Sequence, residues 1–257
     1  MQPTEKVLKT QPDRAVRAAG SLYLLLVVTS IFGFVTPQTL IVARDATATA
    51  HNILAAETLF RLAIVSALIA SIAFVFLARA LYRLLSGIDK TRASLMVILV
   101  LVSIPISFVT ALNEIAALTL IHGGPALSGL GTSQINALAM FFLSLSSNTS
   151  ALNSIFFGLW LFPFGLLVIK SGFIPQILGY FLIIAGCSYV VGSLNFVLSP
   201  PFSPLVSSIA TVGYLGELAI VAWLVFKAAQ VQFGGTNSQV LSNDAKSDSK
   251  LEGGNAW

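Results

Sequence analysis

One glutamate, Glu217, lies inside a long apolar stretch of a chain in which only 9% of the 257 residues are charged. It precedes Lys227 by ten residues, or roughly 15 Å of helix, which would place it near the middle of a bilayer. A carboxylate at that depth costs on the order of 3 kcal/mol or more, so we expect a neutral acid that hydrogen-bonds a neighbour. Tyr214, one turn earlier, is a candidate partner, and the amides of Asn113 and Asn153 are others. Glu217 is then either a site for a ligand or proton, or only a polar link between helices.

Further polar side chains of the apolar stretches fall in the half that lies nearer to residues 44–61. They are Arg61, Asn113, Glu114, Asn153 and Asn195. Arg61 and Glu114 both lie near the same ends of their helices, and we expect them to form an ion pair. Together with Tyr214 and Glu217, this asymmetry predicts a ligand-binding cavity that opens toward that side. The alternative is that each amide simply bonds a neighbouring helix.

Residues suited to catalysis are few. His51 and His122 are the only histidines, and the single cysteine, Cys187, lies in an apolar stretch. A zinc site would therefore need both histidines and one of the carboxylates near them. The sequence contains no Gly-rich phosphate loop, no G-x-S-x-G elbow and no HExxH motif. We predict no catalytic residue, no metal site and no cofactor, and an intramembrane metal-assisted hydrolase is the alternative.

The elements that position these residues are predicted to be membrane-spanning helices. The chain is 56% hydrophobic with a mean hydropathy of +0.89, and its apolar stretches near 20 residues long predict an all-α polytopic bundle. The six predicted transmembrane helices are residues 18–35, 62–81, 93–121, 151–169, 176–198 and 205–226. They form one membrane domain, 18–227, between a cytoplasmic N-terminal segment, 1–17, and a disordered cytoplasmic tail, 228–257.

Two polar stretches fall between these spans. Residues 44–61 contain no Gly or Pro, and Asp45 stands where an N-cap would, which predicts a short interfacial helix leading into the next span. Residues 134–169 are too long for one simple span, and their middle, 144–150, is rich in Ser, Thr and Asn. We therefore predict a short interfacial or re-entrant helix over 135–143, separate from the span that begins at residue 151.

The basic residues predict the orientation. Of the 14 Lys and Arg residues, 12 fall on one side of the predicted spans, and only Arg44 and Arg61 fall on the other. By the positive-inside rule both termini are cytoplasmic and residues 44–61 face outward. The net charge of +4 follows from this bias, so we expect no nucleic-acid partner. The expected partners are the lipid bilayer and a small amphipathic ligand.

Three separated blocks of the sequence carry a resemblance to a known family: RDATATAHNILAAETLFRLA, KSGFIPQILGYFLIIAGCSYVVGS and GYLGELAIVAWLVFK. From residue 18 to residue 227 the chain resembles a bacterial membrane family catalogued as domain of unknown function 4386. The resemblance implies a multi-pass protein of the bacterial cytoplasmic (inner) membrane, in which the outer loop and Glu217 belong to the family pattern. The family is uncharacterised, so the resemblance assigns no catalytic or binding residue.

The sequence favours a non-enzymatic protein that binds or transports a small amphipathic molecule through an outward-facing cavity. The metal-assisted hydrolase is one alternative. A structural partner of another membrane protein is the other.

Overall fold

The computed structural model describes residues 3–198 and 217–226, and every regular element within them is a helix. The elements are α1 (Pro3–Leu40), α2 (Ala46–Ala55), α3 (Glu57–Leu85), α4 (Lys90–His122), the 3-10 turn η1 (Pro125–Leu127), α5 (Thr132–Leu159), α6 (Leu161–Ser171) and α7 (Gln176–Leu198). A shorter apolar helix follows at Glu217–Phe226.

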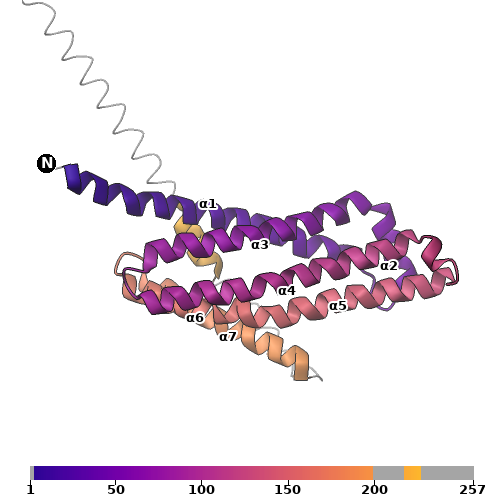
Figure 1. Cartoon of the computed structure of the whole chain (residues 1–257). Coiled ribbons are helices and arrows are strands. Elements are labelled where there is room, and N and C mark those ends of the chain that lie inside the picture. The colour runs from indigo at the N-terminus through magenta and orange to yellow at the C-terminus, as the bar shows by residue number, and fades with distance from the viewer. Residues whose placement is uncertain (1–2, 199–216, 227–257) are drawn as a thin grey trace, which may run out of the picture.

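The long helices lie side by side along one axis (Figure 1). Among them α1 packs on α3, α3 on α4, and α4 on α5, while α7 packs on both α5 and α6. The helix α2 and the connection from α4 to α5 lie at one end of the bundle, here called the α2 end. The α3–α4 and α6–α7 connections lie at the other, here called the opposite end (Figure 1).

Five segments of the described chain are long and apolar enough to cross a membrane. They are Val16–Leu40, Glu57–Leu85, Lys90–His122, Thr132–Ser171 and Gln176–Leu198. The predicted class, a polytopic helix bundle, is confirmed. Of the predicted sixth span, residues 205–226, only the final helical part belongs to the described residues, and the predicted tail lies outside them.

The predicted division of residues 134–169 is wrong, because α5 runs without interruption through the polar stretch 144–150. Two hydroxyls of this stretch donate to carbonyls four residues back, Ser144 to Met140 at 2.9 Å and Thr149 to Leu145 at 2.7 Å, and so stay within the helix. The helix instead ends at Leu159, and α6 begins two residues later. Pro163 explains this position, because it has no N–H to donate to the Leu159 carbonyl.

Carboxylates cap two of the helices. The Asp45 side chain accepts the Ala48 N–H at 2.8 Å, which confirms the predicted N-cap of α2. At the opposite end, Asp89 accepts the Arg92 N–H at 3.0 Å and also pairs with the Arg92 guanidinium. The backbone bond from Arg92 holds the pKa of Asp89 below its usual value, because it stabilises the charged carboxylate.

The bundle buries two separate apolar clusters. The larger lies toward the opposite end and includes Tyr23, Leu77, Leu81, Met96, Trp160, Phe164, Leu182 and Leu224. The smaller lies toward the α2 end and consists of Ile53, Phe60, Ile64, Ala111, Ala117, Leu118, Ala139 and Leu143. The smaller cluster fixes α2 and the start of α3 against α4 and α5, and so positions the polar residues at that end.

Two pairs of glycines bring α7 into direct backbone contact with α5 and α6. A Cβ atom on Gly158 would lie 2.7 Å from the Gly186 carbonyl oxygen, and one on Gly165 would lie 2.7 Å from the Gly179 carbonyl oxygen. Gly179 and Gly186 are seven residues apart within α7, so both contacts fall on one face of that helix. Gly158 of α5 and Gly165 of α6 are also seven residues apart. Larger residues would separate the helices there.

Candidate functional site

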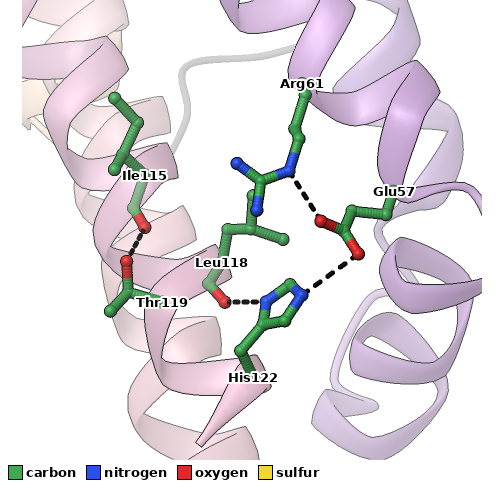
Figure 2. Close-up of polar contacts among 6 residues, drawn as sticks. All are labelled: Glu57, Arg61, Ile115, Leu118, Thr119 and His122. Atoms are coloured by element: carbon green, nitrogen blue, oxygen red, sulfur yellow. Dashed lines mark hydrogen bonds and ion pairs between the residues drawn. The ribbon is translucent and has the colours of Figure 1, made fainter.

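Three ionisable side chains form a continuous cluster between α3 and α4 at the α2 end (Figure 2). Glu57 Oε1 accepts a hydrogen bond from Arg61 Nε at 2.6 Å, and its Oε2 lies 3.0 Å from His122 Nε2. The other ring nitrogen of His122, Nδ1, lies 2.8 Å from the Leu118 carbonyl oxygen. We call Glu57, Arg61 and His122 the charged cluster.

Local sequence explains why these three residues meet. Glu57 is the first residue of α3, directly after the short helix α2, and Arg61 follows it by one turn on the same face. His122 is the last residue of α4, and the next residue, Gly123, has a positive φ of 69°. A glycine adopts a positive φ without strain, so the chain can leave the helix just after the histidine.

The ring of His122 lies between two acceptors. Its Nδ1 faces the Leu118 carbonyl and its Nε2 faces the Glu57 carboxylate, so whichever ring nitrogen carries a proton has an acceptor to donate to.

Arg61 uses only its Nε nitrogen within the cluster. Its side chain is 57% exposed, and its guanidinium extends from α3 toward α4 (Figure 2). The described residues offer its two terminal nitrogens no hydrogen bond. Arg61 therefore retains the four N–H groups of its two terminal nitrogens for a further partner.

An open-sided groove of about 310 Å³ runs between α3 and α4, on the side of the cluster nearer the opposite end. It is lined only by apolar residues: Leu68, Phe108, Val109, Ala111, Leu112 and Ile115. Leu68 follows Arg61 by two turns on the same face of α3, and Ile115 precedes Leu118 by one turn of α4. One end of the groove therefore faces toward Arg61, which precedes Leu68 by two turns of α3, roughly 10 Å.

The predicted pair between Arg61 and Glu114 is wrong. Arg61 binds Glu57 within its own helix, whereas Glu114 faces α5 and accepts a hydrogen bond from Ser146 Oγ at 3.1 Å. Glu57 precedes Arg61 by four residues, the spacing at which oppositely charged side chains of a helix lie side by side, so Glu57 and not Glu114 is its partner.

A second polar contact joins α4 and α5, seven residues along each helix from the contact between Glu114 and Ser146. Asn153 Nδ2 of α5 donates to Ser107 Oγ of α4 at 2.9 Å, and the buried Asn153 Oδ1 has no hydrogen-bond partner among the residues that the structure describes. The two contacts, with Glu114 and with Asn153, thus follow one antiparallel register. The seven-residue spacing of these polar residues in each helix is the sequence feature that would predict this line of contacts, here called the α4–α5 seam.

Glu217 joins three helices in the other half of the bundle. Its Oε1 accepts from the Tyr23 hydroxyl at 2.9 Å, and its Oε2 accepts from the Tyr189 hydroxyl at 3.0 Å. The partners expected from the sequence were Asn113 and Asn153, and neither is one: Asn153 binds Ser107, and Asn113 Nδ2 donates to a carbonyl of its own helix. The other expected partner, Tyr214, lies outside the described residues.

The predicted ligand-binding residues therefore lie in separate groups. Arg61 belongs to the charged cluster, Glu114 and Asn153 to the α4–α5 seam, and Glu217 to a tyrosine pair. Asn195, on α7, and Asn113, on α4, are both half-buried, and Asn113 donates to the Val109 carbonyl of its own helix. The sequence did not point to the groove or to Glu57 as the partner of Arg61.

Metal ligation finds no support in the described part of the chain. No three His, Cys, Asp or Glu side chains there are grouped so that they could hold a metal ion. His122 is engaged with Glu57, and His51 is exposed on α2. The two histidines are thus not brought together with a carboxylate in the way that the metal-assisted alternative requires.

Comparison with known proteins gives one curated relative and a family. A stretch of 80 residues is 36% identical to an uncharacterised protein of Archaeoglobus fulgidus, and covers 31% of this chain and 46% of the relative. The chain thus spans under half the length of that relative, and the similarity is not confined to bacteria. No solved structure matches. The model of the family described as domain of unknown function (DUF4386) matches residues 18–228, almost the whole helical bundle, and the chain belongs to that family.

Proposed function

We propose that this protein binds a small amphipathic molecule, whose apolar tail occupies the groove between α3 and α4. The observation that carries the proposal is the groove itself, about 310 Å³ in volume and lined only by apolar residues. It is open at its side, so a tail could enter from the surrounding lipid. This differs from the cavity expected from the sequence, which opens outward at the side of residues 44–61.

The exposed apolar residues of α4 support a position for the groove within one leaflet. They run from Leu95 to Ile115, a span of 20 residues or roughly 30 Å, which is the thickness of a hydrocarbon core. The groove residues of α4, from Phe108 to Ile115, occupy the part of this band nearest the α2 end. Arg61 and His122 would then lie at the level of the lipid headgroups.

The orientation is part of the proposal. The excess of Lys and Arg at the opposite end favours a cytoplasmic location for that end and for both termini. The groove would then open into the outer leaflet of the cytoplasmic membrane. Amphipathic molecules of that leaflet could reach the groove by lateral diffusion.

The test is photo-crosslinking in lipid nanodiscs with a lysophosphatidylcholine that carries a diazirine in its acyl chain. We expect labelled peptides to come chiefly from residues 108–115. Val109→Trp should lower this labelling roughly fivefold, because the indole fills the groove and removes dispersion contacts with the tail. Val109 is 47% exposed, so the bundle should accommodate the larger side chain.

Ile98→Trp is the matched control, because Ile98 lies on the same helix, is 55% exposed and does not line the groove. It should leave labelling of residues 108–115 unchanged. Even labelling of every lipid-facing helix, or equal effects of the two tryptophans, would refute tail binding in the groove.

A further inference from the structure

We propose that the charged cluster of Glu57, Arg61 and His122 is the headgroup site of this groove, and that it selects a single-chain amphiphile with an anionic phosphate or carboxylate head. The inference rests on the proposed function, because it assigns the second half of the same ligand. It goes further by naming the chemical class of the head and the residues that recognise it.

The tail alone cannot give selectivity in a membrane. Lipid tails are as apolar as the groove, so transfer of a tail from lipid into the groove gains packing and little hydrophobic free energy. Selection among amphiphiles must then come from the polar head. The head of a molecule whose tail lies against Leu68 and Ile115 would extend past the end of the groove toward Arg61, which precedes Leu68 by two turns, roughly 10 Å, on the same face of α3.

Arg61 has the chemistry that an anionic head requires. Its two terminal nitrogens have no hydrogen bond within the described residues, and its side chain is 57% exposed. The planar guanidinium offers paired N–H donors that match the oxygens of a phosphate or carboxylate. The Nε bond to Glu57 holds the guanidinium in place, which reduces the conformational entropy lost on binding.

The acidic member of the cluster does not cancel its attraction for anions. Both oxygens of Glu57 are occupied, one by Arg61 and the other by His122. The nearby helix α2 contributes two titratable groups, Asp45, which caps α2 through Ala48, and the exposed His51, and neither has a recorded bond to the cluster.

The experiment compares two lipids with the same acyl chain, lysophosphatidylglycerol and lysophosphatidylcholine, by native mass spectrometry of the full-length protein in nanodiscs. The first has one net negative charge at all pH values used, and the second has none. We expect the wild-type protein to prefer the anionic lipid roughly tenfold. Arg61→Gln should remove this preference, because it should weaken binding of lysophosphatidylglycerol more than binding of lysophosphatidylcholine, whose phosphate is offset by the choline cation.

Arg44→Gln is the matched control for Arg61→Gln. Arg44 is an exposed arginine in the loop before α2, at the same end of the bundle, and it lies outside the charged cluster and the groove. The variant should keep the preference. If Arg61→Gln keeps the preference too, or if Arg44→Gln removes it equally, the proposed headgroup site is wrong.

The groove variant separates this proposal from the one it rests on. Val109→Trp should weaken both lipids by the same factor and leave their ratio unchanged. If Val109→Trp has no effect on the binding of either lipid, the proposed tail site is wrong. If Val109→Trp weakens both lipids but Arg61→Gln does not change the ratio of their affinities, only the proposed headgroup site is wrong. Displacement of lysophosphatidylglycerol by excess inorganic phosphate would indicate a site for free anions and would overturn the assignment to an amphiphile.

Discussion

Glu217 links three helices through its two carboxyl oxygens. Each oxygen accepts one phenol hydroxyl, from Tyr23 of α1 and from Tyr189 of α7. Tyr23 is 0% exposed, so its hydroxyl depends on this acceptor. The arrangement ties the first helix of the bundle to the last described one, and its first role is to hold them together.

The two substitutions Glu217→Gln and Glu217→Leu should therefore have different effects. The glutamine can still accept one phenol hydroxyl and donate to the other, so we expect near wild-type stability. The leucine leaves the buried Tyr23 hydroxyl without its acceptor, which should cost about 1–3 kcal/mol. SDS-induced unfolding in mixed micelles measures both.

Tyr23→Phe provides the control, because it removes the donor that Glu217→Leu would leave unsatisfied. The double variant should lose less stability than the two single variants added together. Strict additivity would show that Tyr23 and Glu217 do not stabilise each other.

The sequence was informative about Glu217 and uninformative about its partners. A carboxylate within an apolar stretch is expensive wherever the chain places it, so its importance could be predicted from one residue. Its contact with Tyr23 joins residues 194 positions apart, and Tyr23 is one of five tyrosines. Nothing in the sequence around Tyr23 distinguishes it from the other tyrosines as the partner of Glu217. The same reason made Glu114 seem a suitable partner for Arg61, although it faces the other neighbour of α4.

At the scale of the helices, close approach is set by small residues rather than by charge. The paired glycines of α5, α6 and α7 bring the backbones together, since a Cβ on Gly186 would lie 2.8 Å from the Gly158 carbonyl oxygen. Gly192 lies on the same helix, but a Cβ there would meet nothing within 4 Å. The two positions thus form a natural comparison within α7.

Gly186→Ala should destabilise the protein by about 1–3 kcal/mol, because the added methyl group displaces the α5 backbone. Gly192→Ala should be neutral or should stabilise by about 0.5–1 kcal/mol, because alanine is the better helix former. Thermal or SDS unfolding of the two variants gives the comparison. Similar losses at both positions would contradict the packing described for α7.

The limits of helices were harder to predict than their number or order. Residues 144–150 read as an interruption because polar side chains are rare within membrane helices. Yet Thr149 donates to the Leu145 carbonyl at 2.7 Å, and Ser146 faces Glu114, so both are satisfied without leaving the helix. The true break, at Trp160, depends on the single residue Pro163, within a stretch that looks uniformly apolar.

At the scale of the whole molecule, the exposed apolar residues agree with the lengths of the helices. On α7 they extend from Ile177 to Leu198, again a length of roughly 30 Å. Two helices on opposite sides of α5 thus present lipid-facing surfaces of similar height. The 33-residue α4 is longer than this band, so its last turns extend past it at the α2 end.

Cysteine labelling in intact cells would establish the orientation. In a Cys187→Ser background, we expect Thr47→Cys on α2 to react with a membrane-impermeant maleimide, and Gly87→Cys in the α3–α4 loop to react only after lysis. Both positions are exposed, so access depends on the side of the membrane. The reverse pattern would invert the topology and place the groove in the cytoplasmic leaflet.

The charged cluster has a fixed height on the bundle, because Glu57 and His122 connect α3 to α4 next to the end of the apolar band. If the hydrocarbon core of the bilayer is thicker or thinner than this band, a movement of the Arg61 side chain alone cannot restore the match between the two. Hydrophobic mismatch would have to be relieved by tilting the whole bundle or by deforming the lipid around it. Bilayer thickness therefore becomes a variable that shifts the headgroup plane relative to Arg61, independently of the composition of the headgroups.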